Sequence, residues 1–267
     1  MKPLDKIFFI GLMLLAWPIT SQSQPIEFRK GIFLHHSTGA CIWGSNGSRT
    51  SVPDEIQKFN LAHHYTGRHA ISLRQQAWPS LDNEWATWHR IFENKDTIQA
   101  DIRPLLRNNR IIIIKSCFPS SNISSIGNPS DTLEPTKKTI MNYKWHWRSI
   151  VKIMKQHPEN FFVIWTNAPL VVQQTNNGEA WLSEKFCLWA KNIFAKGLDS
   201  EFGPFPQNVY VFDFFHTLAD RDGKLPLAYA SDAANSHPNG AATKIAAPLF
   251  VQEVFDAAIK YETIFSE

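Results

Sequence analysis

A serine hydroxyl at the end of an apolar run is the first feature of this sequence that could do chemistry. The run Gly31-Ile32-Phe33-Leu34 stops abruptly at His35-His36-Ser37-Thr38-Gly39. This pattern is typical of a buried strand that delivers a serine to the carboxyl end of a sheet, where open α/β folds keep their sites. A serine beside a glycine is more often a turn or cap residue, so Ser37 is a candidate nucleophile only if the chain also supplies a base.

A histidine near the other end of the chain can supply that base. His237 lies in the polar segment 230–240, just ahead of a closing helical pattern, and Asp232 lies five residues upstream. An imidazole can remove the serine proton, and it needs a third group to fix its tautomer. Ser37, His237 and Asp232 are therefore predicted as nucleophile, base and orienting acid. The alternative is that Asp232 and Asn239 are turn and cap residues and that His237 is merely exposed.

Two other classes of function remain open at this stage. The pairs His35-His36 and His63-His64, together with His237, could converge as metal ligands. Adjacent residues on a strand point to opposite faces, so each pair could supply only one ligand easily, and we predict no metal and no other cofactor. The ten tryptophans would suit a carbohydrate-binding module without turnover. Trp147 and Trp165 lie on apolar elements, however, and are predicted to be core residues.

The elements that must position these residues alternate between strands and helices. One helix is predicted to begin at Ser51, and helical patterns cover three further segments, 136–157, 179–196 and 245–259. The connection 78–92 is expected to hold one short helix. Five segments are predicted as strands: 31–34, 61–65, 111–114, 161–165 and 209–214. The alternation predicts an α/β fold, a three-layer α/β/α sandwich with a mostly parallel central sheet of about five strands.

The amino-terminal residues have the layout of a secretory signal. Lys2 and Lys6 precede the apolar segment 7–19, and small residues follow it up to Ser23. The apolar segment is short for a membrane span, and no cysteine follows it that could carry a lipid. We therefore predict a signal peptide over 1–23, a single domain over 24–267, and a secreted or periplasmic protein without a stable membrane anchor.

Charge and cysteine content narrow the partners. The formal net charge of +3 over 267 residues gives no reason to expect nucleic-acid binding, and the oligomeric state stays open. The chain has three cysteines. Cys41 and Cys117 follow two candidate strands and could approach each other, so a disulfide between them is a hypothesis for an exported protein. Cys187 lies in a helical pattern and is predicted to be a core residue.

The order of these features resembles the sequence blocks of the SGNH (GDSL-type) hydrolase superfamily over residues 31–250. The resemblance rests on Ser37 after the first strand, a Ser-Asn loop after the third, and Asp232 with His237-Pro238 before the last helix. It implies that the serine attacks an ester carbonyl. It also implies an oxyanion hole formed by the serine's own amide, a glycine after the second strand and an asparagine, which are Gly67 and Asn122 here.

The chain departs from the family pattern around these residues. The family's Gly-Asp-Ser is His35-His36-Ser37 here, and the residue three before His237 is Ala234 rather than an aspartate. The function expected from the resemblance is an exported serine esterase that acts through an acyl-serine intermediate. The expected substrates are small acyl esters, such as acetyl esters, or glycan esters, and the mechanism requires no cofactor.

Overall fold

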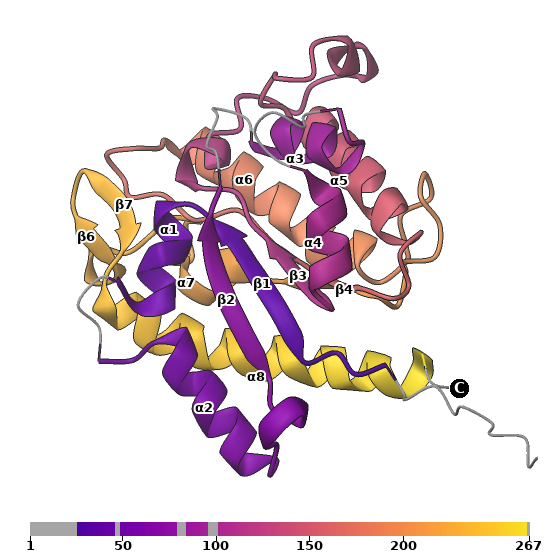
Figure 1. Ribbon diagram of the computed structural model, residues 1–267. Helices are drawn as coiled ribbons and strands as arrows, with labels where there is room; N and C mark the ends of the chain where they lie inside the picture. Colours follow the sequence, from indigo (N-terminus) through magenta and orange to yellow (C-terminus); the bar gives the residue numbers. More distant parts are fainter. Residues whose placement is uncertain (1–25, 46–48, 79–83, 96–100, 266–267) are drawn as a thin grey trace, which may run out of the picture.

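The computed structural model describes residues 26–45, 49–78, 84–95 and 101–265, so the predicted signal peptide lies outside the described residues. Its centre is a five-stranded sheet in which every pairing is parallel (Figure 1). The strand order is β2-β1-β3-β4-β5. The strands are β1 (Lys30–His35), β2 (Ser72–Ala77), β3 (Ile111–Ile114), β4 (Phe161–Trp165) and β5 (Val209–Phe212).

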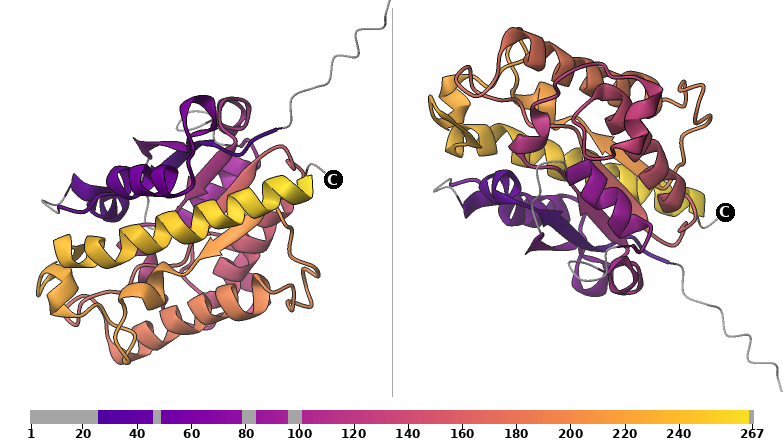
Figure 2. Two further views of the ribbon diagram at one scale, coloured as in Figure 1. Left: turned by 90° about the horizontal axis from the view of Figure 1, so that it is seen from below. Right: turned by 90° about the horizontal axis from the view of Figure 1, so that it is seen from above.

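Alternate residues of each central strand feed two separate hydrophobic clusters, one on each face of the sheet. Ile112 and Ile114 belong to the cluster that contains residues of α3 (Glu84–Phe92), α4 (Ile102–Asn108), α5 (Ile140–Met154) and α6 (Asn177–Trp189). Ile111 and Ile113 belong to the cluster that contains residues of α2 (Val52–Ala62), α7 (Phe214–Leu218) and α8 (Gly240–Phe265). This two-sided burial confirms the predicted three-layer sandwich. Figure 2 shows α8 running along most of the length of the domain.

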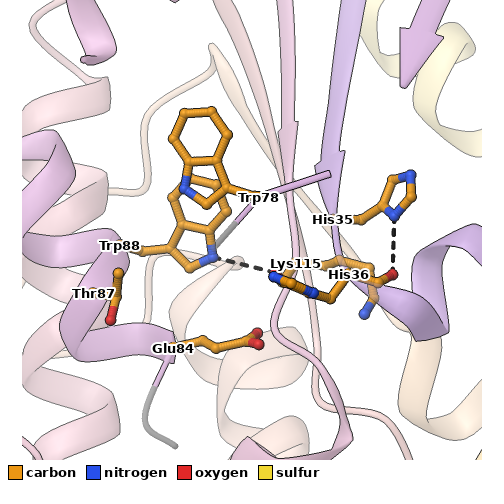
Figure 3. A pocket seen from close by; sticks show the side chains of 7 residues that line it. All are labelled: His35, His36, Trp78, Glu84, Thr87, Trp88 and Lys115. Carbon is orange, nitrogen blue, oxygen red and sulfur yellow. Dashed lines mark hydrogen bonds between the residues drawn. The ribbon is translucent and has the colours of Figure 1, made fainter. Parts of the chain in front are cut away.

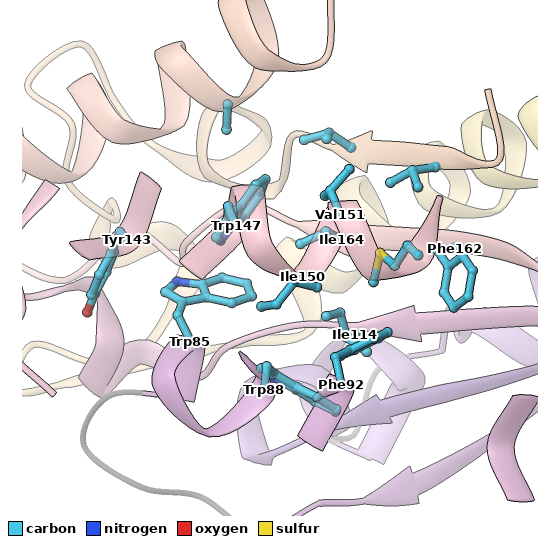
Figure 4. Packing of buried hydrophobic residues seen from close by; sticks show 14 of the residues in the cluster. Trp85, Trp88, Phe92, Ile114, Tyr143, Trp147, Ile150, Val151, Phe162 and Ile164 are labelled. Carbon is cyan, nitrogen blue, oxygen red and sulfur yellow. The ribbon is translucent and has the colours of Figure 1, made fainter. Parts of the chain in front are cut away.

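Large aromatic side chains fill both clusters. Trp147 and Trp165 are fully buried, which confirms that they are core residues, and Cys187 is buried as predicted. The Trp85 and Trp147 rings meet edge to face with centroids 5.0 Å apart, beside Ile150 and other residues of the α3–α6 layer (Figure 4). Such packing fixes α3 and α5 against the sheet. These tryptophans are therefore unavailable for stacking on sugars.

The predicted second strand at 61–65 is wrong. The helix α2 continues to Ala62, and the second strand is β2, which pairs with β1 from Ser72 to Ala77 at the edge of the sheet. Five of the six residues of β2 are exposed, and the sixth, the half-buried Leu73, is the only one of the six with a large apolar side chain. An edge strand that buries so little apolar surface gives almost no hydrophobic signal in the sequence.

Several short elements complete the carboxyl edge of the sheet. The chain leaves β1 into α1 (Ser37–Ala40), which continues into the turn η1 (Cys41–Ser45), and it leaves β3 into η3 (Phe118–Ser121). The segment before α8 forms a hairpin of β6 (Ala230–Asp232) and β7 (Asn235–Pro238), which the sequence did not predict. In the described part of the chain, no helix is both long and apolar enough to cross a membrane.

Candidate active site

Ser37 begins α1 directly after β1 and is exposed. The tight turn at this point depends on Gly39, because a Cβ atom there would lie 2.4 Å from Cβ of His35. His35 is buried, and its Nδ1 donates a hydrogen bond to the carbonyl of His36 over 2.9 Å. The glycine therefore lets the first turn of α1 fold back on the end of β1, which leaves the serine hydroxyl at the surface.

The strand that follows β1 in the sheet brings a thiol to this serine. Strands β1 and β3 are neighbours, although β2 lies between them in sequence, so their carboxyl ends form the point where the strand order reverses. Cys117, just after β3, has its Sγ 3.2 Å from Ser37 Oγ and 3.1 Å from Thr38 Oγ1. Cys41 and Cys117 are both free thiols, so the structure does not contain the hypothesised disulfide.

His237 lies on β7, and its ring is oriented by Asn235. Oδ1 of Asn235 accepts hydrogen bonds from the backbone N–H of His237 over 3.1 Å and from its Nδ1 over 2.5 Å. A backbone N–H can only donate, so the shared atom is the amide oxygen and Nδ1 must carry a proton. In the neutral ring, Nε2 is then the atom that can accept a proton, as a general base requires.

Asp232 does not take the orienting position that the sequence suggested. It pairs with Asn235 across the β6–β7 hairpin, is exposed, and accepts a hydrogen bond from the backbone N–H of Ala234 over 2.8 Å. The physical reason is the hairpin turn, which directs this carboxylate to its own backbone, as aspartates in turns commonly do. The histidine ring donates its hydrogen bond to Asn235 instead.

The serine and histidine elements lie side by side at one edge of the molecule. Residues of α1 and β7 approach within 8 Å between Cα atoms, and Figure 1 shows α1 beside the hairpin. The rings of Phe118 and His237 meet edge to face, with centroids 4.9 Å apart. Phe118 follows Cys117 in the chain, and Cys117 contacts Ser37. No hydrogen bond joins Ser37 to His237 within the described residues. Burial lowers the pKa of His237, and the nearby charge of Lys115 lowers it further.

The structure separates the two predicted oxyanion residues. Gly67 begins the turn η2 (Gly67–His69), which precedes β2, so it lies toward the amino end of the sheet, away from Ser37. This placement follows from the true position of the second strand. Asn122 lies at the end of η3, on the same side as Ser37. Its Oδ1 is buried and has no hydrogen-bond partner in the described part of the chain.

A buried pair of opposite charges lies beside this edge. Glu84 and Lys115, only 3% and 1% exposed, line a narrow crevice that has no room for a water molecule (Figure 3). His35 and His36 line the same crevice. Burial lowers the pKa of Lys115, while the charge of Glu84 opposes that shift.

Sequence reasoning missed three polar residues around the site. Lys115 could have been noticed as a lone charge that ends the apolar run Ile111–Ile114, and Asn235 as an amide two residues before His237. Glu84 carried no signal, because nothing local distinguishes it from a surface acid at a helix start.

The histidines that might have bound a metal do not converge. The Nε2 atom of His35 is hydrogen bonded to the side chain of Gln75, and the ring of His63 stacks on Phe59 and Tyr65 at the end of α2. Within the ranges that the structure describes, no three His, Cys, Asp or Glu side chains are grouped so as to hold a metal ion.

A second histidine–carboxylate pair follows β5. Nδ1 of His216 donates a hydrogen bond to Oδ1 of Asp213 over 2.9 Å, and this hydrogen bond raises the pKa of His216. Strand β5 is three strands from β1, about 14 Å at a spacing of about 4.8 Å per strand. This pair is therefore separate from the Ser37 site.

Comparisons with known proteins add little to this geometry. No family model matches the sequence, and no curated protein matches it. Among solved structures, it is similar to a Bacteroides fragilis chain described as "a putative acylhydrolase", with a TM-score of 0.45 and 11% identity over 86% of this chain and 88% of that chain. A TM-score below 0.5 does not establish a shared fold family, so an assignment of function depends on the arrangement of the side chains.

Proposed function

We propose that this protein is a serine ester hydrolase in which Ser37 is the nucleophile and His237 the base. The observation that carries the proposal is the arrangement at the carboxyl edge of the sheet. The exposed Ser37 lies where the strand order reverses between β1 and β3, next to the β6–β7 hairpin. That hairpin carries His237, whose Nδ1 is already hydrogen bonded to Asn235. Nucleophile, base and orienting amide form the kind of constellation that acyl transfer requires.

The reaction follows the general course of covalent ester hydrolysis. His237 Nε2 accepts the proton of Ser37 as Oγ adds to the ester carbonyl carbon, and the imidazolium then donates that proton to the leaving alcohol. Water, activated by the same imidazole, attacks the acyl-Ser37 ester and releases the acid. The backbone N–H of Ser37 opens a helical turn, where amides lack intrahelical partners, and together with the Asn122 amide it would donate to the developing oxyanion.

The finer assignment extends the sequence resemblance. We assign the chain to the SGNH-type hydrolases as a single domain over 24–267, exported through the signal peptide at 1–23. The proposed substrates are small acyl esters or glycan esters. Nucleic acid, a stable membrane anchor and a cofactor have no role in this proposal. Asn235 replaces Asp232 as the orienting residue in this version of the triad.

The test is hydrolysis of a chromogenic acetate ester, combined with labelling by a fluorophosphonate that reacts with activated serines. We expect wild-type turnover and a label mapped to Ser37 by peptide mass analysis. S37A and H237A should each reduce turnover by at least about 10³-fold, as losses of a nucleophile or base do. The matched control is S231A, because Ser231 is exposed and donates only to the His237 carbonyl, over 3.0 Å.

Two outcomes would overturn the proposal. Turnover that survives in S37A would remove the nucleophile. Binding of oligosaccharides by a wild-type protein that neither cleaves the ester nor takes up the label would favour a carbohydrate-binding module. In that case Ser37 would be a surface serine that caps a turn.

A further inference from the structure

Glu84 is a buried carboxylate whose hydrogen bond goes to the loop that touches Ser37. It is the first residue of α3 and is 3% exposed. Its Oε2 accepts a hydrogen bond from the backbone N–H of Cys117, and its own backbone N–H donates to Ser120 Oγ over 3.1 Å. Burying a carboxylate is costly unless it is hydrogen bonded and its charge is compensated. Glu84 therefore ties α3 to this loop twice, through its carboxylate to Cys117 and through its backbone to Ser120.

Lys115 supplies the compensating charge and ties down the start of the same loop. Its Nζ donates a hydrogen bond to the carbonyl of Ser116, and its own carbonyl accepts one from Trp88 Nε1 over 3.2 Å. Because Trp88 and Glu84 both belong to α3, one helix holds the loop at two points (Figure 3). The segment that leaves β3 is consequently fixed from one side by α3.

The other side of this loop faces the proposed catalytic residues. Cys117 Sγ lies between two hydroxyls, 3.2 Å from Ser37 Oγ and 3.1 Å from Thr38 Oγ1. A thiol has one proton to donate, so at least one of these hydroxyls donates to the sulfur. The backbone of Cys117 is held by Glu84 while its side chain holds Ser37. Two consecutive contacts thus connect a buried acid on α3 to the nucleophile.

We propose that Glu84 is a positioning residue for the nucleophile Ser37 and that it acts through Cys117. The inference rests on the proposed function, because it assigns a role in reactivity to the placement of Ser37. Without the carboxylate, the Cys117 N–H loses its hydrogen-bond acceptor and the buried Lys115 ammonium loses a nearby compensating charge. The loop then has to move to find another acceptor. A displacement of about 1 Å at a reacting group can cost about 10²-fold in rate.

The experiment compares E84A, E84Q and D199N with the wild type. The readouts are kcat and KM on the acetate ester, the rate of fluorophosphonate labelling at Ser37, and thermal unfolding. E84A should lower kcat and the labelling rate by about 10²-fold, with KM within about threefold. E84Q retains an acceptor oxygen of the same length and should recover at least tenfold of that loss. D199N is the control for removing a buried acid, since Asp199 is 4% exposed and pairs with Arg148 away from the loop.

Two cysteine variants test the second contact in the connection. C117S keeps a side chain that can hydrogen bond to Ser37 and should label faster than C117A. If E84A does not fold, the comparison of E84Q with the wild type and of C117S with C117A decides the question. The positioning role is overturned if folded E84A labels within twofold of wild type, or if C117A labels as fast as C117S. A wild-type protein that is not labelled at Ser37 would instead refute the proposed function, and this inference with it.

Discussion

Replacing Asn235 by aspartate puts a negative charge on the side chain that orients the His237 ring. The carboxylate can still accept from Nδ1, which lies 2.5 Å from Oδ1 in the wild type, and from the backbone N–H at 3.1 Å. Burial and Lys115 hold the pKa of His237 below its ordinary value of 6.5. An opposite charge at this distance shifts a pKa by about 1 to 3 units toward the charged form.

The sign of the effect on activity follows from the role of the ring. A general base works when it is neutral, so wild-type kcat/KM should rise with pH through a midpoint below 6.5, as the lowered pKa of His237 requires. In N235D the midpoint should rise by about 1 to 3 units. Activity near pH 6 falls accordingly, while the plateau at alkaline pH is retained. In N235A one hydrogen bond of about 1.5 kcal/mol is lost, which lowers the plateau about tenfold.

The assay is kcat/KM on the acetate ester between pH 4.5 and 9.5, together with NMR titration of the His237 ring. The NMR titration reports the pKa even if the ester is a poor substrate. D232N is the matched control, because the exposed Asp232 carboxylate accepts from Ala234 rather than from the histidine. A midpoint that moves in D232N and stays unchanged in N235D would refute the assignment of Asn235.

Three further predictions follow from other contacts. In G39A, the new Cβ would lie 2.4 Å from Cβ of the buried His35, so circular dichroism melts should reveal a loss of about 1 to 3 kcal/mol in stability and ester turnover should fall. Burial lowers the pKa of His146 to about 4, so the unfolded state takes up a proton first as pH falls. The free energy of unfolding, from urea titrations, should drop by about 3 kcal/mol between pH 7 and pH 4, and less in H146F. Because Asp213 raises the pKa of His216, D213N should lower it toward 6.5 in an NMR titration, and an unchanged value would refute that pairing.

The parts of the fold that could be predicted from sequence are those with dense apolar patterning. The strand Ile111–Ile114 is buried on both faces, as a central parallel strand should be, and its four consecutive isoleucines predict it. The strand before Ser37 is found in the same way, because its apolar run ends where the polar site residues begin. Hydrophobic burial is encoded residue by residue, so a local segment suffices to recognise it.

The edge of the sheet and the hairpin depended on pairing between distant segments. Strand β2 buries little, so only its hydrogen bonds to β1 identify it, and this error moved Gly67 to the wrong end of the sheet. The β6–β7 turn decides that Asn235, rather than Asp232, meets the His237 ring. These two residues are close in sequence, and the hairpin, which no local pattern predicted, decides which of their side chains contacts the ring.

The sequence by itself determined that a serine follows the first buried strand and that a histidine precedes the last helix. Only the tertiary structure decided what surrounds them: the Cys117 thiol against Ser37, and the buried pair of Glu84 and Lys115 behind it. These contacts join β1, β3 and α3, which are separated by many residues along the chain. A hydrogen bond between such segments depends on how the layers pack, and packing is a property of the whole folded chain.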